Sequence, residues 1–331
     1  MNNRRKLLVA LGAGALAAPF DAFSQQQPAK VPRIGLLSPY SPSDTALWHQ
    51  AFRLGLRDLG WVEGKNISIE YRYAEGRYDR IPDLAADLVR LKVDVIVAAV
   101  TQDILAAKNA TRAIPIVMAS PADPVTAGLV ESLARPGGNI TGLSQMAPEM
   151  TGKRLELLKE IVPKLSRVAV LWNPQNPASG SPLSWKEIQL PAQQLGVQLH
   201  SLEARSSNDF DKAFEDATKA RAGALAIMPD PLFAGNLKRI ADLAAKSRLP
   251  SIFHLSEFAN SGGLVTYGPD RSDMYRRAAT YVDKILKGTK PADLPVEQPK
   301  KFEFIINLKA AKQIGLTIPP NVLARADKVI K

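Results

Sequence analysis

The chain has 331 residues, of which 46% are hydrophobic and 23% charged, and its formal net charge at pH 7 is +11. This composition predicts a globular protein with one large or two medium-sized domains and excludes a chain that is disordered in bulk. Basic and acidic residues alternate along the expected helices and no nucleic-acid motif is present, so we expect no nucleic-acid partner. The sequence contains no cysteine, which excludes disulfides, thiolate metal sites and thiol nucleophiles.

The N-terminus has a pattern typical of an export signal. The basic residues Arg4–Lys6 precede an apolar run over residues 7–18 and small residues near Ala22–Ser24. The apolar run is shorter than the roughly 20 residues that span a bilayer, so we predict a signal peptide over residues 1–24. Its arginine pair also fits a twin-arginine signal, and the choice of export route stays open. We expect a mature protein that is soluble in the periplasm, without a lipid anchor.

Strands and helices alternate through the first part of the mature chain. Short apolar runs predict buried strands, and apolar residues at helical spacing predict helices. In chain order we predict a strand at 33–38, a helix at 48–59, a strand within 65–74, a helix at 81–91, a strand at 93–100, a helix at 102–111 and a strand at 114–120. In the segment that follows, Asp123-Pro124 predicts a helix start and Gly137-Gly138 a helix end. This alternation indicates a parallel sheet with right-handed crossovers.

The second part of the chain repeats this order at an offset of about 130–135 residues, which is much longer than a solenoid period. We predict strands at 167–173, within 195–204, at 223–230 and at 248–254, with helices at 210–221 and 237–246. Beyond the repeat we predict a strand at 263–269, a helix at 273–286, a strand at 302–308, a short segment at 309–315 and a final helix near 322–329.

The repetition predicts an α/β protein with two similar doubly wound parallel-sheet lobes. The segments beyond the repeat are expected to cross back and complete each sheet, so that the chain passes between the lobes three times. We place these crossings near Ile140–Ser144, Leu264–Gly268 and Glu303–Leu308. The first lobe then comprises residues 33–142 and 266–300, and the second comprises residues 143–265 and 303–331.

Ligands of open α/β sheets bind outside the carboxyl ends of the strands. In two such lobes these ends face each other across a cleft, which is a preferred place for a small molecule. Acids there could pair with an ammonium group, aromatic residues could pack on a ring, and helix N-termini could receive a carboxylate. The candidate ligand-binding residues are Ser38, Tyr40, Thr101, Gln102, Ser120, Asp123, Asn173, Asp230, Phe233, His254, Phe258 and Tyr267.

Some of these residues have an equally good structural interpretation. Asp123 could serve only as a helix cap, and residues near strand ends such as Trp172 and Phe253 fit a core as well as a pocket. The three histidines, His49, His200 and His254, lack the spacing of metal ligands. We therefore predict no catalytic residue, no metal site and no cofactor.

Four stretches of the sequence resemble a known family. They are "IPIVMASPADPVTAGLVESLARPGGNITG", "VAVLWNPQNP", "GGLVTYGPD" and "LPVEQPKKFEFIINLKAAKQIGLTIPPNVLARAD". Together they resemble the ABC-transporter substrate-binding family that includes tryptophan- and tyrosine-binding lipoproteins, from Arg33 to the C-terminus. The resemblance implies a type I periplasmic-binding-protein fold with a three-segment hinge, and delivery of a ligand to a membrane permease with its ATPase. Many relatives carry a lipobox cysteine, which this chain lacks.

The leading hypothesis is an extracytoplasmic solute receptor, not an enzyme, that acts as a monomer and binds a small organic solute such as an amino acid or aromatic acid. One alternative is a periplasmic ligand sensor that feeds a signalling receptor, because its cleft would look the same. The other is a small-molecule enzyme of the flavodoxin-like type, which lacks support because no cysteine, paired His/acid motif or phosphate loop is present.

Overall fold

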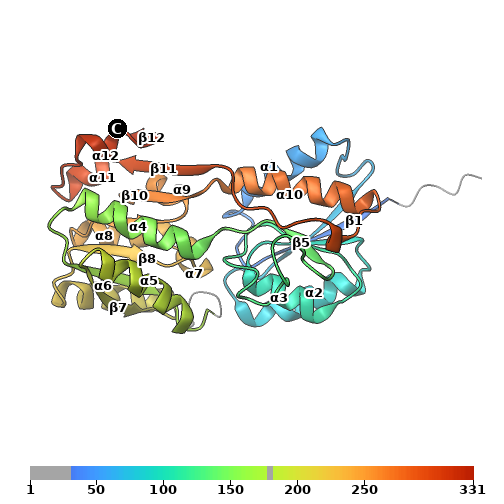
Figure 1. Ribbon diagram of the computed structural model, residues 1–331, viewed down its shortest axis with the longest axis horizontal. Helices are drawn as coiled ribbons and strands as arrows, with labels where there is room; N and C mark the ends of the chain where they lie inside the picture. The colour runs from blue at the N-terminus through green and yellow to red at the C-terminus, as the bar shows by residue number, and fades with distance from the viewer. Residues whose placement is uncertain (1–30, 177–181) are drawn as a thin grey trace, which may run out of the picture. The chain divides into compact units, whose positions relative to one another are not determined.

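Two β-sheets organise the part of the chain that this computed structural model describes, residues 31–176 and 182–331 (Figure 1). The predicted signal peptide lies outside the described residues. The first sheet is parallel throughout and has five strands, in the order β2 (Ser68–Tyr73), β1 (Arg33–Ser38), β3 (Val95–Ala98), β4 (Ile116–Met118) and β5 (Ile140–Gly142).

The second sheet has seven strands, and within it only the β10–β11 pair is antiparallel. In order across the sheet these strands are β12 (Lys328–Ile330), β11 (Phe302–Asn307), β10 (Val265–Pro269), β9 (Ser251–Phe253), β8 (Ala224–Ile227), β6 (Arg167–Trp172) and β7 (Gln198–Glu203).

The predicted duplication is confirmed by the order of the strands. Reading β7-β6-β8-β9-β10 in the second sheet reproduces the order β2-β1-β3-β4-β5 of the first. The central strands β3 and β8 are buried along their whole length, as expected of apolar strands covered on both faces. The registers also correspond, because Arg33 lies opposite Ser68 in one sheet and Arg167 opposite Gln198 in the other.

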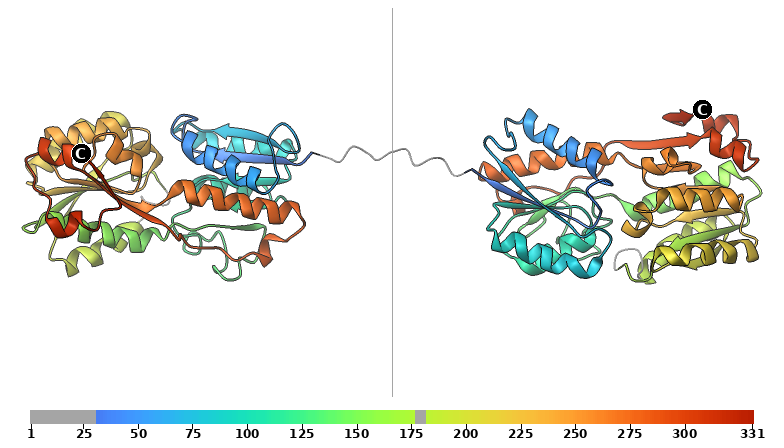
Figure 2. Two further views of the ribbon diagram at one scale, coloured as in Figure 1. Left: turned by 90° about the horizontal axis from the view of Figure 1, so that it is seen from above. Right: turned by 180° about the vertical axis from the view of Figure 1, so that it is seen from behind.

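Helices cover both faces of each sheet (Figures 1 and 2). On the first sheet, one face carries α1 (Ala46–Asp58) and α10 (Arg271–Leu286), and the other carries α2 (Ile81–Arg90) and α3 (Thr101–Ala110). On the second sheet, one face carries α4 (Ala147–Ile161), α5 (Pro182–Gln194), α11 (Leu308–Gln313) and α12 (Pro320–Leu323), and the other carries α6 (Phe210–Lys219) and α8 (Leu237–Lys246). Short helices complete the fold: α7 (Pro231–Ala234), α9 (Ser256–Asn260), η1 (Tyr78–Arg80), η2 (Ser207–Asp209) and η3 (Pro291–Asp293).

The segments beyond the repeat complete only the second sheet. Strands β10, β11 and β12 all join it, whereas the first sheet receives a helix, α10, that packs along α1. The side chain of Asp270 starts this helix by accepting a hydrogen bond from the backbone N–H of Asp273 at 3.0 Å. Residues 266–269, expected in the first lobe, therefore lie in the second sheet. The chain passes from the second lobe to the first between Pro269 and Arg271.

The other two passages also differ slightly from the predicted crossings. Leu143 still bridges to Glu297 beside the first sheet, so the first passage follows at Ser144–Met146, before α4 begins. The third passage runs from Glu297 to Phe302, because the predicted crossing at 303–308 lies within β11.

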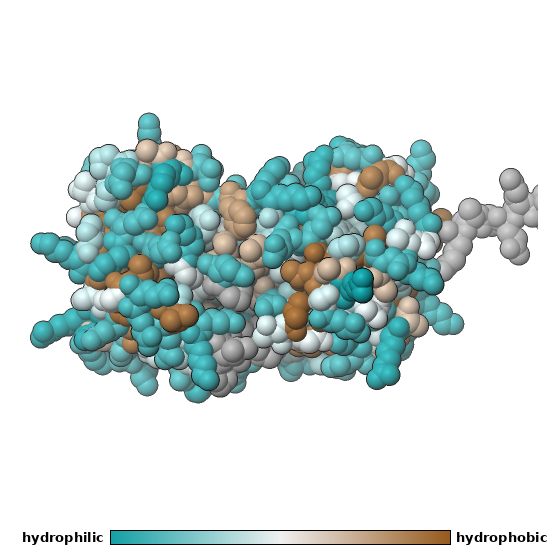
Figure 3. Space-filling view, in the orientation of Figure 1, coloured by the Kyte–Doolittle hydropathy of each residue, from teal (hydrophilic) through white to brown (hydrophobic). Residues whose placement is uncertain are grey.

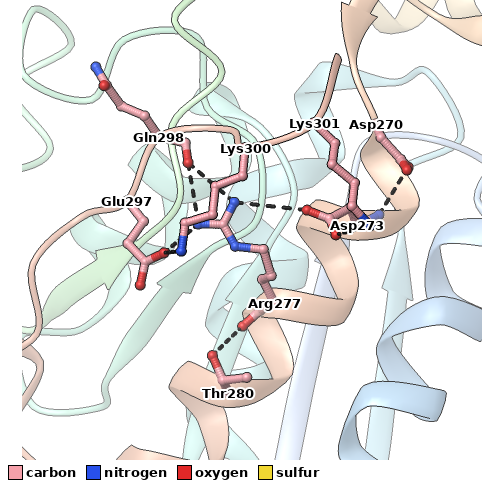
Figure 4. A network of polar contacts seen from close by, with 8 residues as sticks. All are labelled: Asp270, Asp273, Arg277, Thr280, Glu297, Gln298, Lys300 and Lys301. Atoms are coloured by element: carbon pink, nitrogen blue, oxygen red, sulfur yellow. Dashed lines mark hydrogen bonds and ion pairs between the residues drawn. The ribbon is translucent and has the colours of Figure 1, made fainter. Parts of the chain in front are cut away.

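Charged side chains connect the second and third passages (Figure 4). The backbone N–H of Asp270 donates to the carbonyl oxygen of Lys301 at 3.1 Å, and the Lys301 ammonium lies 3.2 Å from the carboxylate of Asp273. The Arg277 guanidinium lies between Asp273 and Glu297 and pairs with both carboxylates. Individual ion pairs of this exposure contribute little, but this network spans both passages and holds them side by side.

Two predicted helices are wrong. Residues 123–139 form turns, because Gly128 adopts a left-handed φ of 64° after a single turn and ends it there. Near the C-terminus the structure has the short helix α12 and the edge strand β12 in place of a helix at 322–329. Strand β12 pairs with β11 over three residues, and this pairing outweighs the local helical pattern.

Gly142 is required by a close approach of two strands. Its φ is 131°, and a Cβ atom would overlap the backbone carbonyl oxygen of Met118 on β4. We expect Gly142→Ala to lower the free energy of unfolding by roughly 1–3 kcal/mol, measured by urea unfolding. Gly138→Ala is the matched control, because nothing lies within 4 Å of a Cβ atom there. Equal stability of the two variants would contradict this account of Gly142.

The described surface is mainly polar. Figure 3 shows hydrophilic side chains over most of the face in view, with apolar residues in separate small patches. None of the helices among the described residues is both long and apolar enough to cross a membrane. The large hydrophobic side chains that are exposed are Val31, Leu47, Val62, Val125 and Leu190.

Candidate functional site

The carboxyl ends of the strands in the two lobes are connected by side-chain contacts. The Tyr78 hydroxyl donates to Asp230 Oδ1 at 3.0 Å, and the Gln102 amide donates to Asn176 Oδ1. The Trp48 indole N–H also donates to Glu257 Oε1 at 3.0 Å. We call this line of contacts between the two lobes the seam. These contacts pair residues of η1, α3 and α1 with residues that follow β8, β6 and β9, so the strand ends at which a ligand is expected meet at this seam.

Asp230 is the carboxylate around which the seam is built. It follows β8 and caps α7, accepting a hydrogen bond from the backbone N–H of Leu232 at 2.7 Å. It also accepts hydrogen bonds from Tyr78, across the seam, and from Asn176 Nδ2 at 2.7 Å. Only 2% of the residue is exposed, and this burial raises the pKa of its carboxyl although the hydrogen bonds act in the opposite direction.

Tyr78 acts as a neutral hydrogen-bond donor. Burial and the neighbouring Asp230 carboxylate both raise the pKa of its hydroxyl above the usual value of 10. The proton therefore stays on the Tyr78 oxygen at neutral pH and is directed to Asp230.

A guanidinium group and three rings meet on the first-lobe side of the seam. Arg271, the first residue of α10, lies 4.8 Å from the Trp48 ring centroid and donates to the Tyr40 hydroxyl at 3.3 Å. Trp48 contacts the Tyr40 ring edge-on at 5.4 Å and stacks on Tyr275 at 5.9 Å. Stacking on Trp48 shields the guanidinium from water while leaving its N–H groups available.

The second N–H edge of Arg271 reaches the second lobe. Its Nη2 lies 3.1 Å from His254 Nε2, at the end of β9. Arg154, on α4, donates to the backbone oxygen of Tyr267 at 3.4 Å and to the Thr151 hydroxyl at 3.0 Å. Burial and the positive charges of Arg271 and Arg154 lower the pKa of His254 well below its usual value.

The N-terminus of α3 is held by Asp103. Its carboxylate accepts hydrogen bonds from the backbone N–H groups of Ala99 at 2.6 Å and Val100 at 2.9 Å. Burial raises the pKa of this carboxyl to about 7. Asp103 thus fixes the loop that presents Gln102 to the second lobe, and its own oxygens are occupied by backbone donors.

The structure brings several of the sequence-predicted residues together at the seam. Tyr40, Gln102, Asp230 and His254 make the contacts described above. Asn173 lies beside Asp230, and its side chain is a further hydrogen-bonding partner of that carboxyl.

The side chains of three of the remaining candidates form hydrogen bonds with backbone groups at the strand ends. Ser38 accepts from the Tyr40 N–H at 3.3 Å, Thr101 accepts from the Ala122 N–H at 3.3 Å, and Ser120 donates to the Ala99 oxygen at 3.0 Å.

The last four candidates make local contacts: they are Asp123, Phe233, Phe258 and Tyr267. The Asp123 carboxylate caps its own turn through the backbone N–H groups of Val125 and Thr126, at 3.0 and 3.1 Å. Phe233 and Phe258 are fully buried against Phe210 and Phe253. Tyr267 packs on the two phenylalanines of β11, Phe302 and Phe304, each at 6.2 Å.

The sequence reasoning missed one residue in the loop after β6, Asn176, and four that approach the seam from helices: Trp48, Tyr78, Arg154 and Arg271. One of them carried a usable signal. Arg154 lies on the same helical face as Leu158 and Ile161, which are buried, so a charged residue occupies an apolar stripe. A buried arginine on such a stripe needs hydrogen-bond or ion-pair partners. Its presence therefore indicates polar groups in the region that the helix faces.

Comparison with known proteins now identifies the chain. Residues 41–330 match the family model of ABC transporter substrate binding proteins. The chain belongs to this family. Among its relatives, the tyrosine-binding protein of Clostridioides difficile (strain R20291) is 28% identical over 267 residues, which are 81% of this chain and 76% of that protein.

Solved structures of this family show the type I periplasmic-binding-protein fold. A conserved domain protein from Vibrio cholerae is 29% identical with a TM-score of 0.85, over 91% of this chain and all of the other. A domain from Streptococcus pneumoniae in complex with L-Trp is 26% identical with a TM-score of 0.82, over 90% and 99% of the two chains. The fold class and the family resemblance expected from the sequence are thereby confirmed.

A further solved structure that the chain resembles is ligand-free and open. The ligand-free, open structure of a Clostridium difficile substrate-binding protein with adhesive properties is 25% identical and covers 91% of this chain and 99% of its own, but its TM-score is only 0.67. The L-Trp complex has nearly the same identity and a TM-score of 0.82.

Proposed function

We propose that this protein is an extracytoplasmic receptor that binds an amino acid with an aromatic side chain between its lobes and delivers it to an ABC permease with its ATPase. The observation that carries the proposal is Asp230, a buried carboxylate at the seam whose partners come from both lobes. A carboxylate in this position suits a ligand ammonium group. The tyrosine-binding relative and the L-Trp complex support the aromatic amino acid as the ligand class.

The proposed mechanism is a shift between open and closed populations. A ligand that contacts both lobes stabilises the closed form by its higher affinity for that form. We propose that the three passages at 144–146, 269–271 and 297–302 are the hinge, because a few backbone angles there can absorb the motion. The permease then recognises the closed form.

The proposal keeps the expectations that the structure leaves untested. These are an export signal over residues 1–24, a periplasmic location without a lipid anchor, and a monomeric receptor. The family assignment favours binding over the flavodoxin-like enzyme considered from the sequence, because the family consists of substrate-binding proteins.

A thermal-shift screen tests this function. A ligand at about 100 times its Kd adds roughly 2.7 kcal/mol to the free energy of unfolding, which for a chain of this size is a rise in Tm of roughly 5 °C. We expect L-tryptophan, L-tyrosine or L-phenylalanine to give this rise, and neutral sugars to give none. Sugars that raise Tm while every amino acid fails would contradict the proposal.

A further inference from the structure

The protonation of His254 follows from its contact with Arg271. A guanidinium group only donates hydrogen bonds, so His254 Nε2, 3.1 Å from Arg271 Nη2, accepts. Because nearby positive charge and burial lower the pKa of His254, its ring is neutral and its one proton lies on Nδ1. The Nδ1–H group is therefore a donor.

This donor is buried without an acceptor. His254 is 4% exposed, and its Nδ1 has no hydrogen-bond partner among residues 31–176 and 182–331. Buried polar groups are nearly always paired, and an unpaired one costs roughly 1–3 kcal/mol. An acceptor supplied from outside the chain would remove this cost.

Two buried guanidinium groups lie near the same ring without a carboxylate partner. Arg154 is 5% exposed and Arg271 is 6% exposed, and within the described parts of the chain neither forms an ion pair. Burial lowers the pKa of Arg154 only to about 10, so it stays charged at neutral pH. Buried charges normally have a partner of opposite sign.

Neither Asp103 nor Asp230 forms an ion pair with this cluster. Asp103 acts on Arg271 electrostatically, but its carboxylate is engaged by the backbone N–H groups of Ala99 and Val100. The Asp230 carboxylate is engaged by Tyr78, Asn176 and the backbone of α7. The cluster of Arg154, His254 and Arg271 thus presents donors and positive charge.

We propose that Arg154, His254 and Arg271 form the subsite that receives the carboxylate group of the bound solute. The three residues come from α4, the end of β9 and the start of α10, so a carboxylate there touches the second lobe and the hinge together. With Asp230 as the partner of the ammonium group, the cleft binds the two charged groups of an amino acid at separate positions. This inference rests on the proposed function and adds the site of the second charge.

Paired ligands that differ only in the carboxylate test the subsite. Isothermal titration measures the Kd of L-tryptophan and of tryptamine, which keeps the ring and the ammonium group. The wild-type protein is expected to bind tryptamine at least 100-fold more weakly. In Arg154→Met and His254→Leu the Kd for L-tryptophan is expected to rise 10- to 100-fold, as for the loss of one charged hydrogen bond, while tryptamine binding changes less than 3-fold.

Conservative and remote variants complete the test. Arg154→Lys and His254→Asn, whose amide nitrogen lies near the position of Nδ1, are expected to recover part of the discrimination against tryptamine. Arg325→Met, which removes an exposed arginine paired with Glu160, is the matched control and leaves the Kd for L-tryptophan unchanged. Thermal unfolding of each variant checks that it is folded.

The outcomes separate the subsite from the function. If the wild-type protein binds L-tryptophan and the variants keep its full preference over tryptamine, the subsite is wrong while the receptor function stands. If the wild-type protein binds no aromatic amino acid, the proposed function fails and the subsite fails with it. If either Arg154→Met or His254→Leu unfolds, the other variant decides in the same way.

Discussion

Asp230→Ala is expected to weaken the binding of an aromatic amino acid by roughly 10²- to 10³-fold, because removal of one partner of a buried ion pair costs roughly 3–5 kcal/mol. The carboxylate is buried between the lobes and Tyr78 donates to it across the seam. In the variant, the ligand ammonium group would lose its counter-charge in a site closed to water. Titration calorimetry with L-tryptophan or L-tyrosine measures the change.

Asp230→Asn separates the charge of this residue from its structural contacts. The asparagine keeps the size of the side chain and an oxygen that accepts from Leu232 N–H and the Tyr78 hydroxyl. Its N–H₂ group faces the Asn176 amide, which has to turn over so that its oxygen accepts. A residue that only caps α7 would tolerate this change, whereas an ammonium partner would not. We expect Asp230→Asn to lose at least 10-fold in affinity with a nearly unchanged Tm. If Asp230→Asn binds the amino acid with full affinity, Asp230 only caps α7 and does not pair with the ammonium group.

The same carboxylate predicts how affinity depends on pH. Burial raises the pKa of Asp230 in the ligand-free protein above its usual 3.8, whereas a bound ammonium group would favour the ionised form. Binding is therefore coupled to loss of a proton, so affinity is full above the pKa of the free protein and falls as the pH decreases through it. Calorimetry in acidic buffers is expected to show this fall in the wild-type protein and its absence in Asp230→Asn.

The fold was largely predictable from the sequence because the chain repeats itself. Two apolar runs that start with Arg33 and Arg167 form the corresponding strands β1 and β6, and the neighbouring strands follow in the same order. The tail was predicted less well. Whether residues 265–269 join one sheet or the other depends on pairing with β9, which precedes them, and with β11, which lies more than 30 residues later, and no local pattern carries that information.

The site was predictable to the extent that it follows strand ends. Tyr40, Asp230 and His254 come directly after strands of the repeat, and the structure places them at the seam. The same rule also selected Phe233 and Phe258, which turn into the core, because position in sequence does not fix the direction of a side chain. Residues such as Trp48 and Arg271 reach the seam from helices, and only tertiary packing brings them there.

Trp48→Ala is expected to have the largest effect on stability in the first lobe. Trp48 is 3% exposed, and its ring contacts Tyr40, Tyr275 and the Arg271 guanidinium. Truncation of a buried tryptophan to alanine costs roughly 3–5 kcal/mol, which urea unfolding measures directly. A loss below about 1 kcal/mol would contradict the packing described for this residue.

Trp48→Phe isolates the contact between the lobes. Phenylalanine retains an aromatic ring against Arg271 but lacks the indole N–H that donates to Glu257. Glu257→Leu removes the acceptor from the other side, so the two variants and their combination form a double-mutant cycle. We expect the two single variants each to shift the ligand-free population toward the open form, seen as a larger radius of gyration in X-ray scattering. The second substitution should add almost nothing to the first, because either one breaks the same bond. Additive effects would mean that this hydrogen bond does not hold the lobes together in solution, and that closure depends on Tyr78 and Gln102 instead.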